Sequence, residues 1–158
     1  MVGSHVPTRE EWVNNPLATG TAVYSLVRNS VRPRWAGDIL ATCCDRMAAV
    51  PDAVQRVLGL ALDESHWVLA HDAFTDVRHL TLSAQRADTE GSYHYLLTVA
   101  ENAAKVIYNA SGAPAPFDKD CGAWLVRWTK QFADRENNVE FTERLWQVVL
   151  RYTQISAS

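Results

Sequence analysis

Apolar residues recur every three to four positions along almost the whole chain, and this spacing limits the fold more than any other feature. The clearest case lies between residues 93 and 108, where the apolar side chains fall within about 120° of a helical wheel. They are Tyr93, Leu96, Leu97, Ala100, Ala104, Ile107 and Tyr108. No segment shows the sustained period-2 alternation of a half-buried strand, and no Asn-Gly or Asp-Gly pair indicates a hairpin. The pattern predicts an all-α fold.

Start and stop signals divide this pattern into a single-domain bundle of seven or eight helices with short loops. Thr8 and Glu11 form a capping-box pair that opens the first helix, which should end near Asn14. Pro33 and Pro51 separate later helices because the residue before a proline avoids the helical region. We expect the remaining helices over about 18–29, 34–49, 52–62, 63–85, from a start signal at 88–91 to 110, 119–134 and 139–154.

The domain should span residues 8–155, with tails at 1–7 and 156–158. Gly3-Ser4-His5 resembles a cloning remnant, so we expect the first tail to be disordered and leave His5 out of site arguments. The sixth helix also carries Glu101 and Lys105 on the side opposite its apolar stripe, at a spacing that favours an ion pair.

Composition narrows the class of protein. The chain has 158 residues, 47% of them hydrophobic, which fits one globular domain with a real core. No run of about 18 apolar residues indicates a membrane-spanning helix. The net charge of −3 argues against nucleic acid as a partner, and so does the absence, in the two basic clusters, of interleaved aromatics arranged as a base-stacking platform. These clusters are Arg28/Arg32/Arg34 and Arg127/Lys130/Arg135.

Three cysteines, Cys43, Cys44 and Cys121, do not form a disulfide framework. We expect three free thiols in a reducing cytosol, with at least one of the adjacent pair buried. Residues 1–6 lack the apolar core of a secretory signal peptide, which agrees with a cytoplasmic location.

Motifs of nucleotide binding, zinc binding and serine hydrolysis are absent. The main polar constellation is Asp72, Asp76 and His79, which share one face of the fifth helix, with His71 nearby. Such a face can ligate a divalent metal only if a second helix completes the shell. His71-Asp72 resembles the metal-binding dipeptide of the HD phosphohydrolases, but the further ligands of that family are missing. We therefore predict no metal and no cofactor, and we assign no catalytic residue.

Six tryptophans are many for this length, and an exposed aromatic patch would indicate a partner site. Trp146 lies off the main apolar stripe of the last helix, so it belongs either to a second core face or to such a patch. His94 and Tyr95 flank the stripe of the sixth helix. The candidate binding residues are Trp35, Trp146, Tyr95 and His94.

The first 50 residues carry one resemblance. Thr8-Arg9-Glu10-Glu11-Trp12, followed about 30 residues later by Ala41-Thr42-Cys43-Cys44-Asp45-Arg46, resembles the opening of a group of bacterial helical proteins with a Glu-Trp start and a Cys-Cys-Arg-Arg stretch. Asp45 stands where that stretch usually continues with Arg. The resemblance implies a helical bacterial protein and transfers no function.

Three functions remain open. The preferred hypothesis is a small soluble module that binds a protein partner, of the immunity, adaptor or regulatory kind, without catalysis of its own. The alternatives are a metal-dependent or histidine-using helical hydrolase, and a binder of an apolar small molecule in a Trp-lined pocket between helices. No membrane association is expected, and a homo-oligomer is left open.

Overall fold

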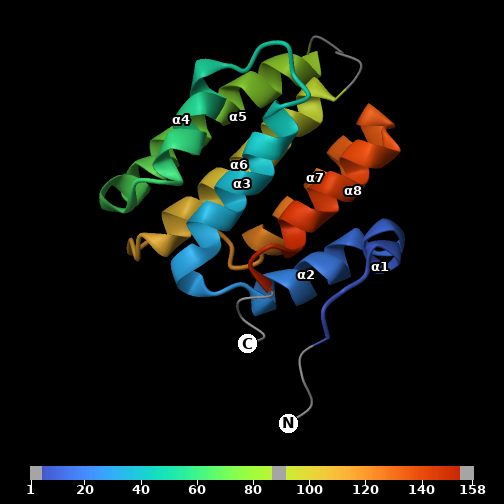
Figure 1. Ribbon diagram of the computed structural model, residues 1–158. Helices are drawn as coiled ribbons and strands as arrows, with labels where there is room; N and C mark the ends of the chain where they lie inside the picture. Colours follow the sequence, from blue (N-terminus) through green and yellow to red (C-terminus); the bar gives the residue numbers. More distant parts are fainter. Residues whose placement is uncertain (1–4, 87–91, 154–158) are drawn as a thin grey trace.

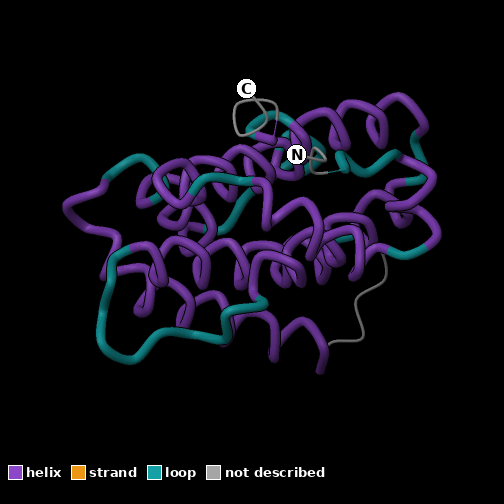
Figure 2. Tube along the Cα trace, turned by 90° about the horizontal axis from the view of Figure 1, so that it is seen from below, coloured by secondary structure: helices purple, strands orange, loops and turns teal. Residues whose placement is uncertain are grey.

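The computed structural model describes residues 5–86 and 92–153, and these residues form one compact all-helical body without strands (Figures 1 and 2). The predicted all-α bundle is therefore confirmed. The α-helices are α1 (Arg9–Asn14), α2 (Pro16–Leu26), α3 (Arg32–Cys44), α4 (Asp52–Leu60), α5 (Ala70–Arg86), α6 (Tyr93–Ala110), α7 (Cys121–Glu136) and α8 (Val139–Leu150). Two 3-10 helices, η1 (Asn29–Val31) and η2 (Glu64–Leu69), lie in the connections.

Local signals set the ends of several helices. The Thr8 hydroxyl accepts a hydrogen bond from the Glu11 amide at 3.2 Å, and the Glu11 carboxylate accepts one from the Thr8 amide at 3.1 Å. This is the predicted capping box, which satisfies two amides that the helix itself leaves free. At α8 the Asn138 side chain accepts from the Phe141 amide at 3.0 Å.

Some boundaries differ from the expected ones. α3 begins at Arg32 and holds Pro33 in its first turn, where the missing amide proton costs nothing. The expected fifth helix is divided, because its first turns are the 3-10 helix η2 and only the part from Ala70 is α5. The start signal at 88–91 lies outside the described residues.

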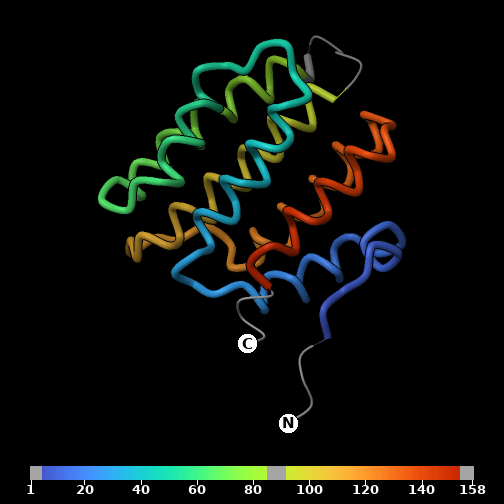
Figure 3. The backbone as a smooth tube through the Cα atoms, viewed as in Figure 1, coloured from blue at the N-terminus to red at the C-terminus, as the bar shows by residue number. Residues whose placement is uncertain are grey.

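α6 is the central helix of the bundle. It packs against α3, α5 and α7, and it lies behind α3 with α4 and α5 on one side and α7 and α8 on the other (Figures 1 and 3). A helix in this position is buried almost all round. Glu101 is only 4% exposed, so the expectation that it lies opposite the buried face is wrong. α5 covers the side of α6 that the sequence pattern assigns to water.

Two of the predicted binding residues belong to the core. Trp35 is fully buried, and its indole donates a hydrogen bond from Nε1 to the Val149 carbonyl at 2.9 Å. Trp146 is 3% exposed and stacks on Trp12 with 4.9 Å between ring centroids. Both side chains therefore join helices inside the molecule, and no exposed patch exists at Trp146.

The thiols are free in the structure. Cys43 and Cys121 are buried and Cys44 is half-buried, which confirms that one of the adjacent pair lies inside. Burial raises the pKa of Cys44 and of Cys121 to about 11, and the pKa of Cys43 lies well above the usual range for the same reason. Among the described residues, no helix has the length and apolar character to cross a membrane.

Candidate functional site

A cavity of about 280 Å³ lies where α5 and α7 flank the polar edge of α6. Its volume is near the lower end of the range for ligand pockets, roughly 300 to 1,000 Å³. The residues that line it are Arg78 and Thr81 of α5, His94, Thr98, Glu101, Asn102 and Lys105 of α6, Asp118 of the following loop, and Cys121, Trp124 and Trp128 of α7.

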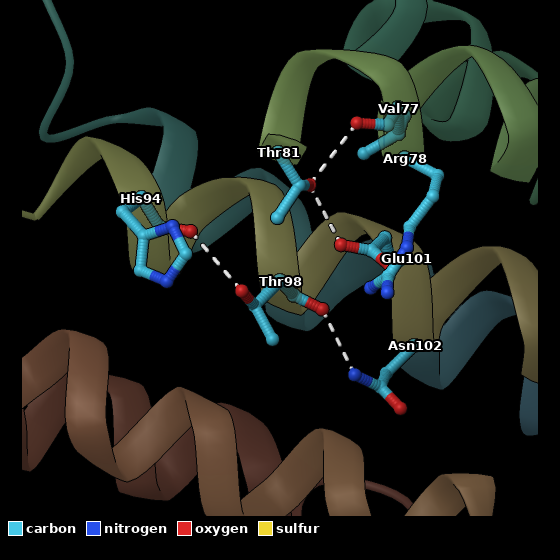
Figure 4. A network of polar contacts seen from close by, with 7 residues as sticks. All are labelled: Val77, Arg78, Thr81, His94, Thr98, Glu101 and Asn102. Carbon is cyan, nitrogen blue, oxygen red and sulfur yellow. Dashed lines mark hydrogen bonds and ion pairs between the residues drawn. The ribbon is translucent and has the colours of Figure 1, made fainter. Parts of the chain in front are cut away.

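The inner wall contains the buried carboxylate of Glu101. Its Oε1 accepts a hydrogen bond from Arg78 Nη1 at 3.1 Å, and its Oε2 accepts one from the Thr81 hydroxyl at 2.6 Å (Figure 4). Thr81 Oγ1 also lies 3.1 Å from the Val77 carbonyl, but a hydroxyl has one proton. The shorter bond to the charged oxygen is the stronger one. Both oxygens of Glu101 are thus occupied by α5, which fixes α5 against α6.

The next part of the wall is a ladder of polar side chains along α6. The Thr98 hydroxyl donates to the His94 carbonyl at 3.1 Å, and the Asn102 amide donates to the Thr98 carbonyl at 2.9 Å (Figure 4). Figure 4 shows the Asn102 oxygen turned away from Glu101, toward α7. His94 Nδ1 is buried and has no hydrogen-bond partner within the described chain.

The opposite wall is aromatic. Trp124 and Trp128 lie one turn apart on α7, and the Arg127 guanidinium is 5.2 Å and 5.7 Å from their ring centroids. Tyr95 of α6 stacks on Trp128 at 6.0 Å and has Arg135 at 5.8 Å from its own ring. Trp128 of the same helix and Tyr95 of α6 thus place aromatic rings beside Arg127 and Arg135 of this basic cluster.

Lys105 lies at the other end of the α6 edge. Its ammonium is 5.4 Å from the Phe74 ring centroid and 5.8 Å from that of Phe117. Within residues 5–86 and 92–153 no carboxylate lies within ion-pair distance of it, so the expected Glu101–Lys105 pair does not form. Arg78 of α5 takes the place of Lys105 at Glu101.

The loop after α6 supplies Phe117, one of the two aromatic rings beside Lys105. Asn109 bonds Phe117 twice, accepting from its amide at 2.8 Å and donating to its carbonyl at 3.1 Å. This clamp holds the Phe117 ring 5.2 Å from His71 and 4.8 Å from Phe74. The loop backbone thereby becomes a fixed rim of the cavity beside the first turn of α7.

The acidic face of α5 lies elsewhere. Asp76 forms an ion pair with Arg56 of α4 at 3.4 Å, and His79 lines the same shallow groove between α4 and α5. His71 stacks on Phe117, and Asp72 is exposed. In the part of the chain that the structure describes, no three His, Cys, Asp or Glu side chains are grouped to hold a metal ion.

Of the predicted binding residues, His94 lines the cavity and Tyr95 flanks it through Trp128. The sequence interpretation did not identify Arg78, Thr81, Thr98, Asn102 or Lys105 as site residues. One signal was present, because Thr98, Asn102 and Lys105 follow His94 along one edge of an otherwise apolar helix. A polar stripe of this kind is also typical of a solvated face.

One thiol also lines the cavity. The Cys121 thiol stays protonated at neutral pH because burial raises its pKa to about 11. Comparisons of the chain with family models, curated proteins and solved structures give no match.

Proposed function

We propose that this protein is a small helical binding protein that takes a small polar ligand into the cavity between α5, α6 and α7, without catalysis of its own. One observation carries the proposal. The α6 wall of the cavity holds the buried Asn102 and the Lys105 ammonium, which has no hydrogen-bond or ion-pair partner within the described chain, and Trp124 and Trp128 line the same cavity from α7.

The energetic argument concerns the Lys105 ammonium, which is partly buried and has aromatic rings but no hydrogen-bond or ion-pair partner in the described chain. A hydrogen bond to a charged group contributes about 1.5–3 kcal/mol, so a ligand acceptor placed at this ammonium gains up to that amount on binding. The indole rings opposite supply apolar area for the ligand body.

The lining also supports a polar rather than an apolar small molecule as the ligand. A Trp-lined pocket between helices suits an apolar ligand only when its other walls are apolar. Here the α6 wall presents Thr98, Asn102 and Lys105, which would lose their hydrogen bonds to water against an apolar ligand. The cavity therefore favours a ligand that carries polar atoms along one side and a flat apolar surface on the other.

NMR spectroscopy of the tryptophan side chains tests the proposal. Trp124 and Trp128 line the cavity, whereas Trp12, Trp35 and Trp146 lie in the core. A panel of small polar aromatic fragments should shift the indole N–H signals of the first two and leave the other three unchanged. Shifts confined to the core tryptophans, or no saturable shift with any fragment, would refute the proposed site.

A matched pair of variants localises the effect. Thr98→Phe places a large side chain in the cavity and should abolish the shifts. Thr75→Phe is the control, because Thr75 is also a mid-helix threonine bonded to the carbonyl four residues back, at 3.1 Å, but it is exposed outside the cavity. Fragment binding that survives Thr98→Phe would place the site elsewhere.

A protein partner is the second candidate, favoured by an apolar end of the molecule. Leu62 and Val68, at the turn from α4 to α5, are 71% and 52% exposed. Trp67, next to Val68 in the chain, has a buried Nε1 without an acceptor in the described chain. The simplest partner is a second copy of this chain.

Sedimentation velocity tests for such a dimer. Leu62→Glu should dissociate it, whereas Val139→Glu, at an equally exposed position on α8, should leave it intact. If the wild-type protein is a monomer at all concentrations, the surface around Leu62 does not bind a second copy.

The proposal also includes the cellular compartment in which the protein works. Three free thiols, two of them buried, suit a reducing cytoplasm, where such side chains act as small apolar groups. We therefore propose that the protein works in the cytoplasm, and the resemblance of its first 50 residues suggests a bacterial one.

A further inference from the structure

We infer that the ligand of the cavity is a small organic anion, whose carboxylate or phosphate group lies at the Lys105 end and whose flat body lies along Trp124. This inference rests on the binding function proposed above and names the chemistry of its ligand.

The first step is that the buried negative charge of the cavity is already paired. Glu101 is the only buried carboxylate among the lining residues, and Arg78 and Thr81 occupy its two oxygens. A cationic ligand group would have to displace Arg78 to reach it. Asp118, the other acid at the rim, is exposed, and its Oδ1 accepts the Asp120 amide at 3.1 Å.

The second step is that positive charge is available. Lys105 is partly buried and has aromatic rings but no carboxylate beside it in the described chain. It is close enough to Cys121 that its charge opposes the rise of that thiol's pKa. Cys121 opens the 16-residue helix α7, so the positive end of that helix dipole lies at the same side of the cavity. The amides of Cys121 and Trp124 bond the carbonyls of Asp118 and Asp120, so the helix contributes its dipole and the Lys105 ammonium is the group that would bind the anion.

The third step concerns the remaining hydrogen-bonding groups. Arg78 bonds Glu101 through Nη1 alone and is half exposed, so it keeps further N–H groups for a ligand. Lys105 and Arg78 thus offer N–H donors in a cavity that the Trp124 indole ring also lines. A cavity with this lining fits an aromatic acid better than a free inorganic ion.

Four probes with the same ring separate charge from shape: benzoate, phenyl phosphate, benzyl alcohol and benzylamine. Titrations followed by the indole N–H signal of Trp124 should show saturable binding of benzoate or phenyl phosphate. The better of these two anions should bind at least about tenfold more tightly than benzyl alcohol, which corresponds to one charge-assisted hydrogen bond. Benzylamine should bind most weakly. The ratio of the two anions decides between a carboxylate and a phosphate ligand.

Variants assign the effect to Lys105. Lys105→Met keeps the length and packing over Phe74 but removes the charge, and it should weaken anion binding about tenfold or more. Lys105→Arg should retain most of the affinity. Lys119→Met is the control, because it removes the same charge from an exposed position in the adjoining loop, and it should leave binding unchanged.

The outcomes separate this inference from the proposed function. If benzyl alcohol or benzylamine shifts Trp124 as strongly as the anions do, or if Lys105→Met binds anions as wild type does, the cavity binds a ligand but the anion inference is wrong. If none of the four probes shifts Trp124 or Trp128 while the broader fragment panel also fails, the proposed function is wrong as well.

Discussion

At the scale of single residues, the ion pair between Glu101 and Arg78 is the feature with the clearest energetic consequence. A carboxylate that is 4% exposed loses most of its hydration, and only a partner cation and hydrogen bonds offset that loss. Arg78 and Thr81 supply them from α5. The pair therefore couples the position of α5 to the floor of the cavity.

We predict that Arg78→Met lowers the free energy of unfolding by about 1–3 kcal/mol, because Glu101 stays buried without its counter-charge. The value lies below that of a fully buried pair, since the Arg78 side chain is 53% exposed and solvent screens it. Glu101→Gln should cost less, because an uncharged amide oxygen can still accept from Thr81. Urea denaturation of the three proteins measures both differences.

Arg56→Met is the matched control for Arg78→Met. Arg56 pairs with Asp76 across α4 and α5, but both side chains are exposed, so its loss should cost under about 1 kcal/mol. If the two Arg→Met variants have equal stability, Glu101 does not depend on Arg78 and the description of the inner wall is wrong.

The thiols give a pH dependence at the same scale. Burial raises the pKa of Cys121 to about 11, whereas a thiol in the unfolded chain ionises near pH 8.5. Above that pH the unfolded chain loses a proton that the folded chain keeps, so the unfolded state is favoured. The contribution to stability is complete below about pH 8.5 and is lost progressively as the pH rises toward 11.

Stability should therefore fall between about pH 8.5 and 11, and Cys121→Ala should reduce the slope by up to about 1.4 kcal/mol per pH unit. Urea midpoints measured under reducing conditions at several pH values between 7.5 and 10.5 test this. An identical slope in wild type and Cys121→Ala would show that the folded thiol ionises normally and is not buried.

At the scale of helices, the contact between α2 and α7 requires a glycine. A Cβ on Gly20 would lie 2.5 Å from the Ala123 carbonyl oxygen and 3.0 Å from its Cα, and backbone atoms cannot move aside as a flexible side chain can. Two helices approach this closely only where one of them lacks a side chain. Trp12 adds a bond across the same region, from its Nε1 to the Val126 carbonyl at 3.2 Å.

Gly20→Ala should destabilise the fold by about 1–3 kcal/mol, because the clash outweighs the helix propensity that alanine gains. Gly59→Ala is the opposite case, since nothing lies within 4 Å of its Cβ position in α4, and it should stabilise by about 0.5–1 kcal/mol. Thermal denaturation followed by circular dichroism compares the two. A stabilising Gly20→Ala would contradict the close approach of α2 and α7.

Helices also show which features the sequence predicts. The capping box at Thr8, the proline at Pro51 before α4 and the start of α8 at Val139 depend on a few neighbouring residues, and all three were predicted correctly. The burial of the second side of α6 was not predicted, because the pattern places Glu101 and Lys105 opposite the apolar stripe. The burial of Glu101 depends on contacts with α5, and the periodicity of α6 alone contains no information about them.

At the scale of the whole molecule, the candidate site exists because three helices meet around α6. His94 was identified from the sequence as a flanking polar residue, but Arg78, Thr81 and Trp124 reach the same cavity from α5 and α7. The acidic face at Asp72, which has the denser polar pattern, forms no such site in the described chain. Tertiary packing, rather than the density of polar residues, decides where unpartnered groups come together.

The central claim is that this cavity binds an anion between Lys105 and the α7 tryptophans, and a crystal structure grown with the tighter-binding of benzoate and phenyl phosphate tests it most directly. We predict that the anionic group lies within hydrogen-bond distance of Lys105 Nζ and that the ring lies beside Trp124. Clear density for the anion at another place, or an unoccupied cavity at a saturating concentration of it, would contradict the account.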